Sequence, residues 1–198
     1  MSTYSTLMDF LFTETIKMLA GATNAPVLVT KTFGGIARQV CENVLPFYQP
    51  AGAGGLKNVH DDVVFFNVTY TDDPYNKQVE SVYDGNVDNA LTTVSMQFTR
   101  ALRVSWTCCG DNCYEWAERL RIMLFDADVR TDFAAQNISL IPTVNEPEFA
   151  PEILGQEWLH RYDLFANFYQ SASLVKTQPA VYAARVIIET SEGVEAIC

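Results

Sequence analysis

The amino-acid sequence predicts an α+β fold, in which an antiparallel sheet carries packed helices. Short runs of alternating apolar and polar residues, typical of half-buried strands, outnumber the segments with helical spacing. The strand-like runs are not separated by regular helices, as they are in a parallel α/β fold. With 198 residues, of which 48% are hydrophobic, the chain is expected to form a single domain over residues 1–198.

The first expected element is a helix over residues 4–20, which Gly21 ends. Its polar residues form one narrow stripe at helical spacing: Thr6, Asp9, Thr13 and Lys17. A surface helix needs only one apolar stripe, whereas this helix is apolar over most of its surface. Two interpretations remain open. The helix lies deep in its own core, or it buries one side there and another side in a neighbouring subunit.

The rest of the first half is expected to consist mainly of strands. In order, the pattern predicts a strand over 27–33, a short helix over 36–45, a strand over 63–71 and a short strand over 79–83. Residues 34–62 are expected to be irregular or inserted, with a flexible glycine-rich loop. A phosphate-binding loop is not indicated, because no Gly-Lys-Ser/Thr follows the glycines.

The second half opens with strong alternation over residues 91–107, which predicts one long strand or two strands with a bend. Later elements are a helix from about 110 to 125, a short helix over 129–135 capped by Asp126 or Asp128, and a strand over 138–141. The proline-containing connection after it is expected to be extended and irregular. Two strands finish the chain, over residues 158–169 and 180–190, and the first is apolar on both faces. A projecting hairpin loop over 170–179 is expected to join them.

The formal net charge of −11, from 24 acidic and 13 basic residues, argues against tight or sequence-specific nucleic-acid binding. Most of the excess lies in two stretches, residues 61–89 and 142–157. These stretches are interpreted either as solvated loops or as an acidic surface that repels a polyanion. No apolar run reaches the roughly 20 residues that a membrane-spanning helix needs, so no membrane partner is expected.

The cysteines are the first residues to test for chemistry. Three of the five cluster as Cys108, Cys109 and Cys113, but a structural zinc site needs four ligands, and His60 and His160 are isolated in sequence. The odd number of cysteines and the lack of a signal-peptide pattern predict reduced thiols in a cytosolic compartment. We therefore expect no metal, no cofactor and no enzymatic activity.

The order of elements in the second half carries a resemblance. Strand 102–106 meets a corner at Gly110, a helix follows with the pattern Tyr-x-x-Ala-Glu-x-Leu-Arg over 114–121, and strands over 157–164 and 182–190 end the pattern. This order resembles the phage neck terminator family, related in role to the tail terminator proteins of long-tailed bacteriophages. The resemblance covers residues 1–20 and 90–190, while residues 27–60 and the cysteine-rich corner depart from the expected pattern.

The resemblance implies a tail-terminator-like fold with a helix pair on an antiparallel sheet. It also implies a structural virion protein at the neck, or top of the tail, that resides in the host cytoplasm during assembly. Such a protein forms a ring, most often a hexamer, that caps the tail tube and joins it to the head-side connector or adaptor. DNA passes through the lumen, and the sheath or its terminator is a further partner in a contractile tail. The alternatives are another tail-completion or baseplate adaptor protein, or a small cysteine-dependent enzyme.

Two groups of residues are candidates for assembly. Apolar residues of the first helix and of the 158–169 strand are expected at the subunit interface: Tyr4, Leu7, Leu11, Trp158, Phe165 and Phe168. Acidic residues of the two charged stretches are expected to line the lumen: Asp72, Asp73, Asp84, Asp88, Glu146 and Glu148.

Overall fold

The central feature of the computed structural model is a mixed sheet. The structure describes residues 4–27, 29–33, 36–41, 43–46, 56, 58–74, 79–85, 91–179, 186–190 and 193–197. The sheet has the order β3 (Val44–Pro46), β4 (Val63–Thr71), β6 (Leu91–Cys109), β11 (Arg161–Pro179) and β7 (Ile138–Leu140). Two further strands join it: β5 (Val79–Gly85) pairs with β6, and β8 (Glu148–Phe149) pairs with β11. Among the described strands of this sheet, the β3–β4 pair is parallel and the other pairs are antiparallel, so the fold is α+β, as predicted.

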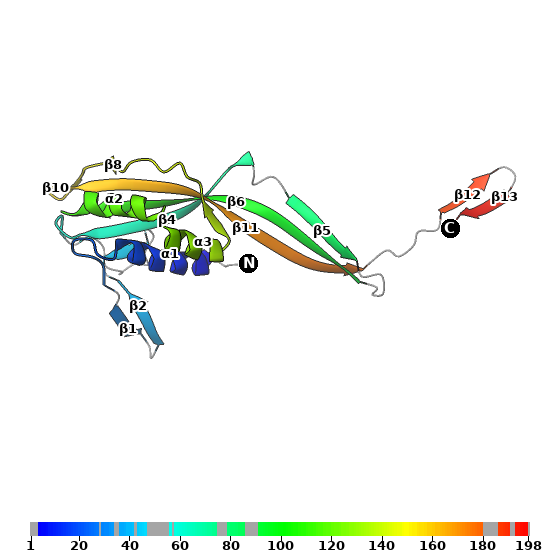
Figure 1. Cartoon of the computed structure of the whole chain (residues 1–198), viewed down its shortest axis with the longest axis horizontal. Helices are drawn as coiled ribbons and strands as arrows, with labels where there is room; N and C mark the ends of the chain where they lie inside the picture. The colour runs from blue at the N-terminus through cyan, green and yellow to red at the C-terminus, as the bar shows by residue number, and fades with distance from the viewer. Residues whose placement is uncertain are drawn as a thin grey trace.

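Three helices cover one face of this sheet: α1 (Tyr4–Leu19), α2 (Cys113–Met123) and α3 (Ala127–Ala135) (Figure 1). The covered face carries every second residue of β6, including Leu102, Val104 and Trp106, which are fully buried against the helices. The indole N–H of Trp106 donates to Thr15 Oγ1 at 3.0 Å, and that of Trp116 donates to the Thr23 carbonyl at 2.8 Å. Both buried N–H groups are therefore satisfied, as a stable core requires.

Helix α1 ends near Gly21, which has a φ of +82°, as the sequence predicts. The four residues of its polar stripe are all exposed, while most of its apolar side chains are buried in the core of the same chain. Phe10 packs edge-on against Phe133 of α3, with ring centroids 5.1 Å apart. Of the two interpretations of this helix, the structure supports the one in which the helix belongs to its own core.

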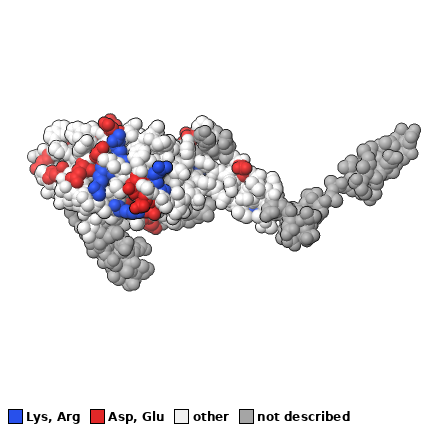
Figure 2. All heavy atoms as spheres, in the orientation of Figure 1, with Lys and Arg blue, Asp and Glu red and all other residues white. Residues whose placement is uncertain are grey.

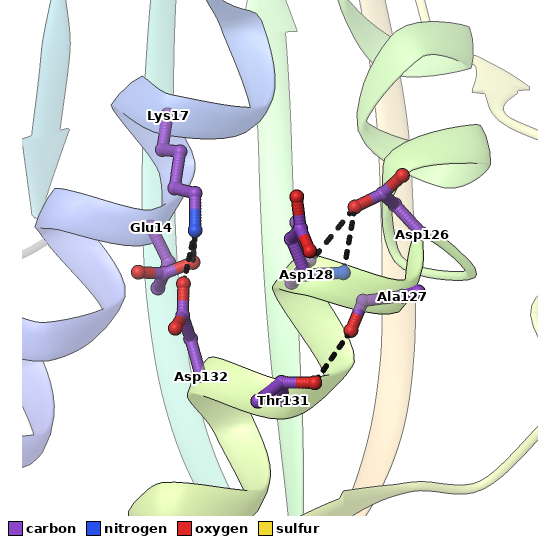
Figure 3. Close-up of polar contacts among 8 residues, drawn as sticks. Glu14, Lys17, Asp126, Ala127, Asp128, Thr131 and Asp132 are labelled. Atoms are coloured by element: carbon purple, nitrogen blue, oxygen red, sulfur yellow. Dashed lines mark hydrogen bonds and ion pairs between the residues drawn. The ribbon is translucent and has the colours of Figure 1, made fainter.

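A polar contact also joins α1 to α3 (Figure 3). Lys17 on α1 donates to Asp132 on α3, and its ammonium lies 4.0 Å from the carboxylate of Glu14. The Asp126 side chain accepts hydrogen bonds from the backbone N–H of Asp128 and Val129, so Asp126 is the N-cap of α3. This cap satisfies two N–H groups that have no partner within the helix.

Strands β6 and β11 pair over their full lengths, from Arg161 opposite Cys109 to Pro179 opposite Leu91. The prediction of a long strand over 91–107 is confirmed, whereas the predicted hairpin loop at 170–179 is wrong because β11 continues to Pro179. We call the body the part of the sheet in which β4 pairs with residues 101–109 of β6 and the helices cover one face. Beyond it, β5 and the distal halves of β6 and β11 form a three-stranded arm (Figure 1).

The remaining strands in the described part of the chain form three small pairs. Residues 36–45 were predicted as a helix, which is wrong: β2 (Ile36–Val40) pairs with β1 (Val29–Phe33). A short segment has no clear periodicity, so cross-strand pairing decides its structure. The predicted 158–169 strand is interrupted at His160, before which β10 (Glu157–Leu159) forms a hairpin with β9 (Glu152–Leu154). Within 180–190, β12 (Val186–Thr190) pairs with β13 (Gly193–Ile197), and residues 180–185 lie outside the described part of the chain.

Candidate functional site: two apolar surfaces

The cysteines at the corner between β6 and α2 are buried. Cys41, Cys108, Cys109 and Cys113 are free thiols inside the chain, while Cys198 lies outside the described residues. Burial raises the pKa of Cys108 well above its ordinary value and that of Cys109 to about 12, so both are protonated thiols at neutral pH. Protonated, buried thiols are poor nucleophiles and poor metal ligands. Within the part of the chain that the structure describes, no group of three or more His, Cys, Asp or Glu side chains could hold a metal.

Both histidines are exposed and border this corner, and the backbone carbonyl of His160 accepts a hydrogen bond from the Gly110 N–H at 3.1 Å. Nδ1 of His60 is 2.9 Å from Oδ1 of Asp111, and the hydrogen bond to this carboxylate raises the pKa of His60 above 6.5. The ring of His160 lies 6.2 Å from that of Phe149, edge-on. The histidines therefore contribute to surface contacts.

The corner serves to position α2. The buried carboxylate of Asp62 accepts hydrogen bonds from the Asn112 backbone N–H at 2.8 Å, from the Asn112 side-chain amide at 2.7 Å and from Asn24 Nδ2 at 2.9 Å. Gly110, with a φ of +108°, lies against the backbone of Asp61, where a Cβ would be only 2.5 Å from the carbonyl oxygen. These contacts fix where the first turn of α2 presents Tyr114 to solvent.

The first candidate surface, the arm face, lies on the arm and consists of Val79, Tyr83, Met96, Phe98 and Leu174. Residues opposite one another in an antiparallel pair share a face, so the pairs Val79–Phe98, Tyr83–Val94 and Leu174–Met96 place these side chains together. The same face of β6 continues under the helices of the body, which stop before the arm (Figure 1). Val79, Tyr83 and Leu174 are 59%, 66% and 45% exposed.

The charges of the arm face are positive. Among its described side chains, Arg100 lies at the base, with its guanidinium 4.8 Å from the Phe98 ring and 5.7 Å from the Tyr70 ring. Lys176 pairs with Val94 and so lies on the same face near the far end. Glu80 lies on the reverse face of the arm. The side chains of that face are mainly polar, apart from Val82 and Val175. Figure 2 shows charged side chains gathered on the body and few on the arm.

The second candidate surface, the aromatic patch, lies at the other end of the body and consists of Tyr114, Phe149, Ile153 and Trp158. The rings of Tyr114 and Phe149 both contact Tyr162, with centroids 5.2 and 5.1 Å away. Ile153 and Trp158 are opposite each other in the β9–β10 hairpin and are 58% and 64% exposed. The exposed acids Glu148, Glu152 and Glu157 lie on the reverse faces of these strands, because they pair with Asp163, Leu159 and Leu154.

The predicted interface residues divide between core and surface. Leu7, Leu11 and Phe168 are 3%, 1% and 1% exposed and belong to the core of the single chain, which corrects their assignment to a subunit interface. Phe165 is half-buried on the sheet face away from the helices, with the Arg103 guanidinium 4.8 Å above its ring. Trp158 is exposed as part of the aromatic patch. The Tyr4 side chain lies outside the described part.

The predicted lumen residues lie on opposite edges of the sheet. Asp72 and Asp73 follow β4, on one side of β6, while Glu146 and Glu148 lie on the segment beyond β11. Asp88, and the side chain of Asp84, fall outside the described residues. The structure therefore does not bring the two acidic groups together on one edge.

The comparisons bear on this arrangement of a body, an arm and two uncovered apolar surfaces. The sequence matches the family model described as phage neck terminator protein over residues 28–194, well over half of the chain. The chain belongs to the phage neck terminator protein family. Membership identifies a structural phage protein of the virion neck, which interacts with other virion proteins.

The neck terminator match confirms the resemblance but changes its extent. It includes residues 28–60, which were expected to depart from the family pattern, and it begins after α1, which was expected to belong to that pattern. No curated protein matches this chain significantly. Among the described residues, no helix is long and apolar enough to cross a membrane.

Sequence reasoning missed most residues of the two surfaces. Val79, Tyr83 and Leu174 stand in segments interpreted as a short strand and a loop, and only their pairing with β6 shows that they share a face. The signal available in the sequence was the alternation of apolar residues. Val94, Met96 and Phe98 occupy even-numbered positions, as do the core residues of β6, and so lie on the same face of the strand. Tyr114 and Ile153 had no such signal, because their exposure depends on which neighbours cover them.

Proposed function

We propose that this chain is a ring-forming protein of the phage neck that terminates the tail tube and joins it to the head-side connector or adaptor. The observation that supports this proposal best is the arm, whose apolar face continues the core face of β6 beyond the helices that cover the body. Contiguous exposed apolar surface on a structural protein marks an interaction site. A component that must contact copies of itself and other virion proteins has a use for such a surface.

In this proposal six copies form the ring, and DNA passes through its lumen. The partners are the tail-tube protein on one side, the head-side connector on the other, and the sheath or its terminator where the tail is contractile. The net charge of −11 is consistent with a lumen from which DNA is released easily. Because the two acidic groups lie on opposite edges of the sheet, only one of them lines the lumen.

An amber mutation in the gene for this chain tests the proposed joining role. Infection of a non-suppressing host is expected to yield filled heads and tails that remain separate, and purified protein added to that lysate is expected to restore joined, infectious particles. The purified subunit is expected to stay monomeric in native mass spectrometry until a tail end templates the ring. Joined particles without the protein, or a copy number of one per neck, would contradict the proposal.

A further inference from the structure

We infer that, in the proposed ring, strand β11 of each copy pairs with strand β5 of the next copy, so that the arms of all copies form one continuous sheet. The inference rests on the proposed function for the existence of a ring, and it names the backbone contact that closes the ring. The occupant of each free edge of the arm is a second copy of this chain.

The arm has two free edges. Within the described part of the chain, β5 pairs with β6 alone, and so do residues 172–179 of β11. Both registers run without a bulge that would turn the edge away from an incoming strand. An edge of this kind presents unpaired N–H and C=O groups to any strand that adds to it. Pro179, which has no N–H, stands at the end of the β11 edge.

The hydrogen bonds of the body show which backbone groups of β11 point outward. The Ser171 N–H donates to the Asn137 carbonyl at 2.9 Å, so this group points away from β6. The direction of the backbone groups alternates along a strand, so those of Ser173, Val175 and Thr177 also point away from β6. Beyond Ser171, these groups have no strand partner among the described residues.

The same alternation identifies the outward groups of β5. Even-numbered residues of β11 bond to even-numbered residues of β6, which leaves the odd-numbered residues of β6 to bond to β5. Those odd-numbered residues are opposite even-numbered residues of β5, such as Glu80 and Val82. The backbone groups of Ser81 and Tyr83 therefore point away from β6. Both edges of the arm thus offer a row of backbone donors and acceptors.

The two free edges match in length and position. β5 pairs with residues 92–98 of β6, and the free part of β11 pairs with residues 91–98 of the same strand. The edges therefore flank one stretch of β6 (Figure 1), and a rotation about an axis along the arm brings β11 of one copy beside β5 of the next. Such a heterologous contact closes into a ring and leaves no edge unpaired. A foreign protein would have to supply two different strands to pair both edges.

The junction between copies is parallel in this arrangement. β5 and β11 are both antiparallel to β6, so they run in the same direction, which rotation about the ring axis preserves. In a parallel junction, Val175 lies beside even-numbered residues of the next copy's β5, which share its face of the sheet. Three arm strands from each of six copies make a barrel of about 18 strands, a size that leaves an open channel.

Cysteine cross-linking in assembled particles tests the junction directly. The background variant is Cys198→Ser, since the other four cysteines are buried. Val175→Cys combined with Glu80→Cys or with Val82→Cys is expected to give disulfide-linked oligomers up to the full ring. Within one chain these positions are two strands apart, roughly 9–10 Å, whereas a disulfide needs Cα atoms within about 7 Å. Each disulfide therefore joins two copies.

The matched controls are Val175→Cys combined with Ser81→Cys or with Tyr83→Cys. These positions lie on the same exposed strand but on the opposite face of the sheet, so they should give about tenfold less cross-linked product. Strands in a closed barrel are staggered, so Ser173→Cys and Thr177→Cys replace Val175→Cys in parallel experiments. Both lie on the same face as Val175, and the preference for even-numbered positions of β5 should persist.

A proline substitution measures the importance of the backbone contact. Val175→Pro removes one outward N–H and no hydrogen bond to β6, and proline is tolerated on edge strands. The yield of joined particles is expected to fall about tenfold or more, because the bond is lost at every junction of the ring. The melting temperature of the isolated subunit should stay close to that of the unmodified protein. Val175→Thr keeps the N–H and the branched side chain, and it should leave the yield unchanged.

The outcomes separate this inference from the proposed function. Cross-links at residues 81 and 83 in place of 80 and 82, a ring with no cross-links, or full yield from Val175→Pro would overturn the parallel junction while a neck ring remained. A wild-type particle without a ring of this chain would overturn the proposed function itself. Cross-links at the even-numbered positions, within a ring, support both.

Discussion

At the residue scale, buried polar groups and one glycine hold the corner between β6 and α2. The Asp62 carboxylate gathers three donors from two other segments, and a hydrogen bond to a charged group contributes about 1.5–3 kcal/mol. Asp62 belongs to the acidic stretch over 61–89, yet it is a buried structural group. One acidic stretch can therefore contain residues with unrelated roles.

Gly110→Ala is expected to destabilise the protein far more than Gly155→Ala. Both glycines have positive φ, of +108° and +68°, and an alanine in a left-handed conformation costs about 1–2 kcal/mol. Only at Gly110 would the new Cβ also meet backbone atoms, with 2.5 Å to the Asp61 carbonyl oxygen, while space is open around Gly155. Chemical denaturation of both variants measures the difference, and equal losses of unfolding free energy would contradict the close approach.

Glu14→Gln is expected to stabilise the protein at neutral pH. Burial raises the pKa of Glu14 above its ordinary value of 4.5, Lys17 partly offsets this effect, and Asp132 adds to it. A carboxyl group with a raised pKa in the folded state favours folding most at low pH, and this contribution is lost as the pH rises through the raised pKa. Lys17 keeps Asp132 as its partner in the variant (Figure 3).

Thermal melts from acidic to neutral pH measure this effect. The advantage of Glu14→Gln over the unmodified protein should appear above pH 4.5 and disappear below it. Glu157→Gln removes the same charge from an exposed strand and serves as the control, with little change expected. A melting temperature of Glu14→Gln that stays below that of the unmodified protein across this range would show that the carboxylate is stabilising.

At the scale of elements, alternation and capping residues specify most helices and strands. The even-numbered apolar residues of β6 run without a break from Val94 to Cys108, except at Arg100, and the strand is continuous through that position. Arg100 is accommodated because its guanidinium stacks on the neighbouring Phe98 and Tyr70 rings. Periodicity therefore predicted the strand, and an aromatic pair explains its one exception.

Asp126→Ala is expected to cost about 1 kcal/mol of stability, the usual value for loss of an N-cap. Asp126 has extended backbone angles and accepts from the N–H groups of Asp128 and Val129 at 3.0 and 3.4 Å. Asp128→Ala is the comparison, and it should cost well under half as much, because alanine regains helix propensity as the favourable charge is lost. Urea denaturation measures the free energy of unfolding of both variants. A larger loss of this free energy for Asp128→Ala would make Asp128 the main stabilising residue of this turn.

At the scale of the whole molecule, the sheet separates the two acidic groups. Replacing Asp72 and Asp73 with lysine, or Glu146 and Glu148 with lysine, is expected to slow DNA ejection from assembled particles in one of the two cases only. The reason is that the pairs lie on opposite edges of the sheet, so at most one edge faces the axis of the ring. Time-resolved ejection assays measure the effect. Equal ejection rates for both variants and the unmodified particle would contradict an acidic lumen.

The amino-acid sequence by itself determined the fold class, the polar stripe and the end of α1, the long strand β6, and the two helices after Gly110. These features depend on local periodicity, capping and turn residues, which act over a few positions. Tertiary structure alone decided that Leu7, Leu11 and Phe168 are core residues, that residues 170–179 continue β11, and that Tyr83 and Leu174 share an uncovered face. Burial and strand pairing depend on residues that are distant in sequence, so the same alternating pattern describes a covered face in the body and an open face on the arm.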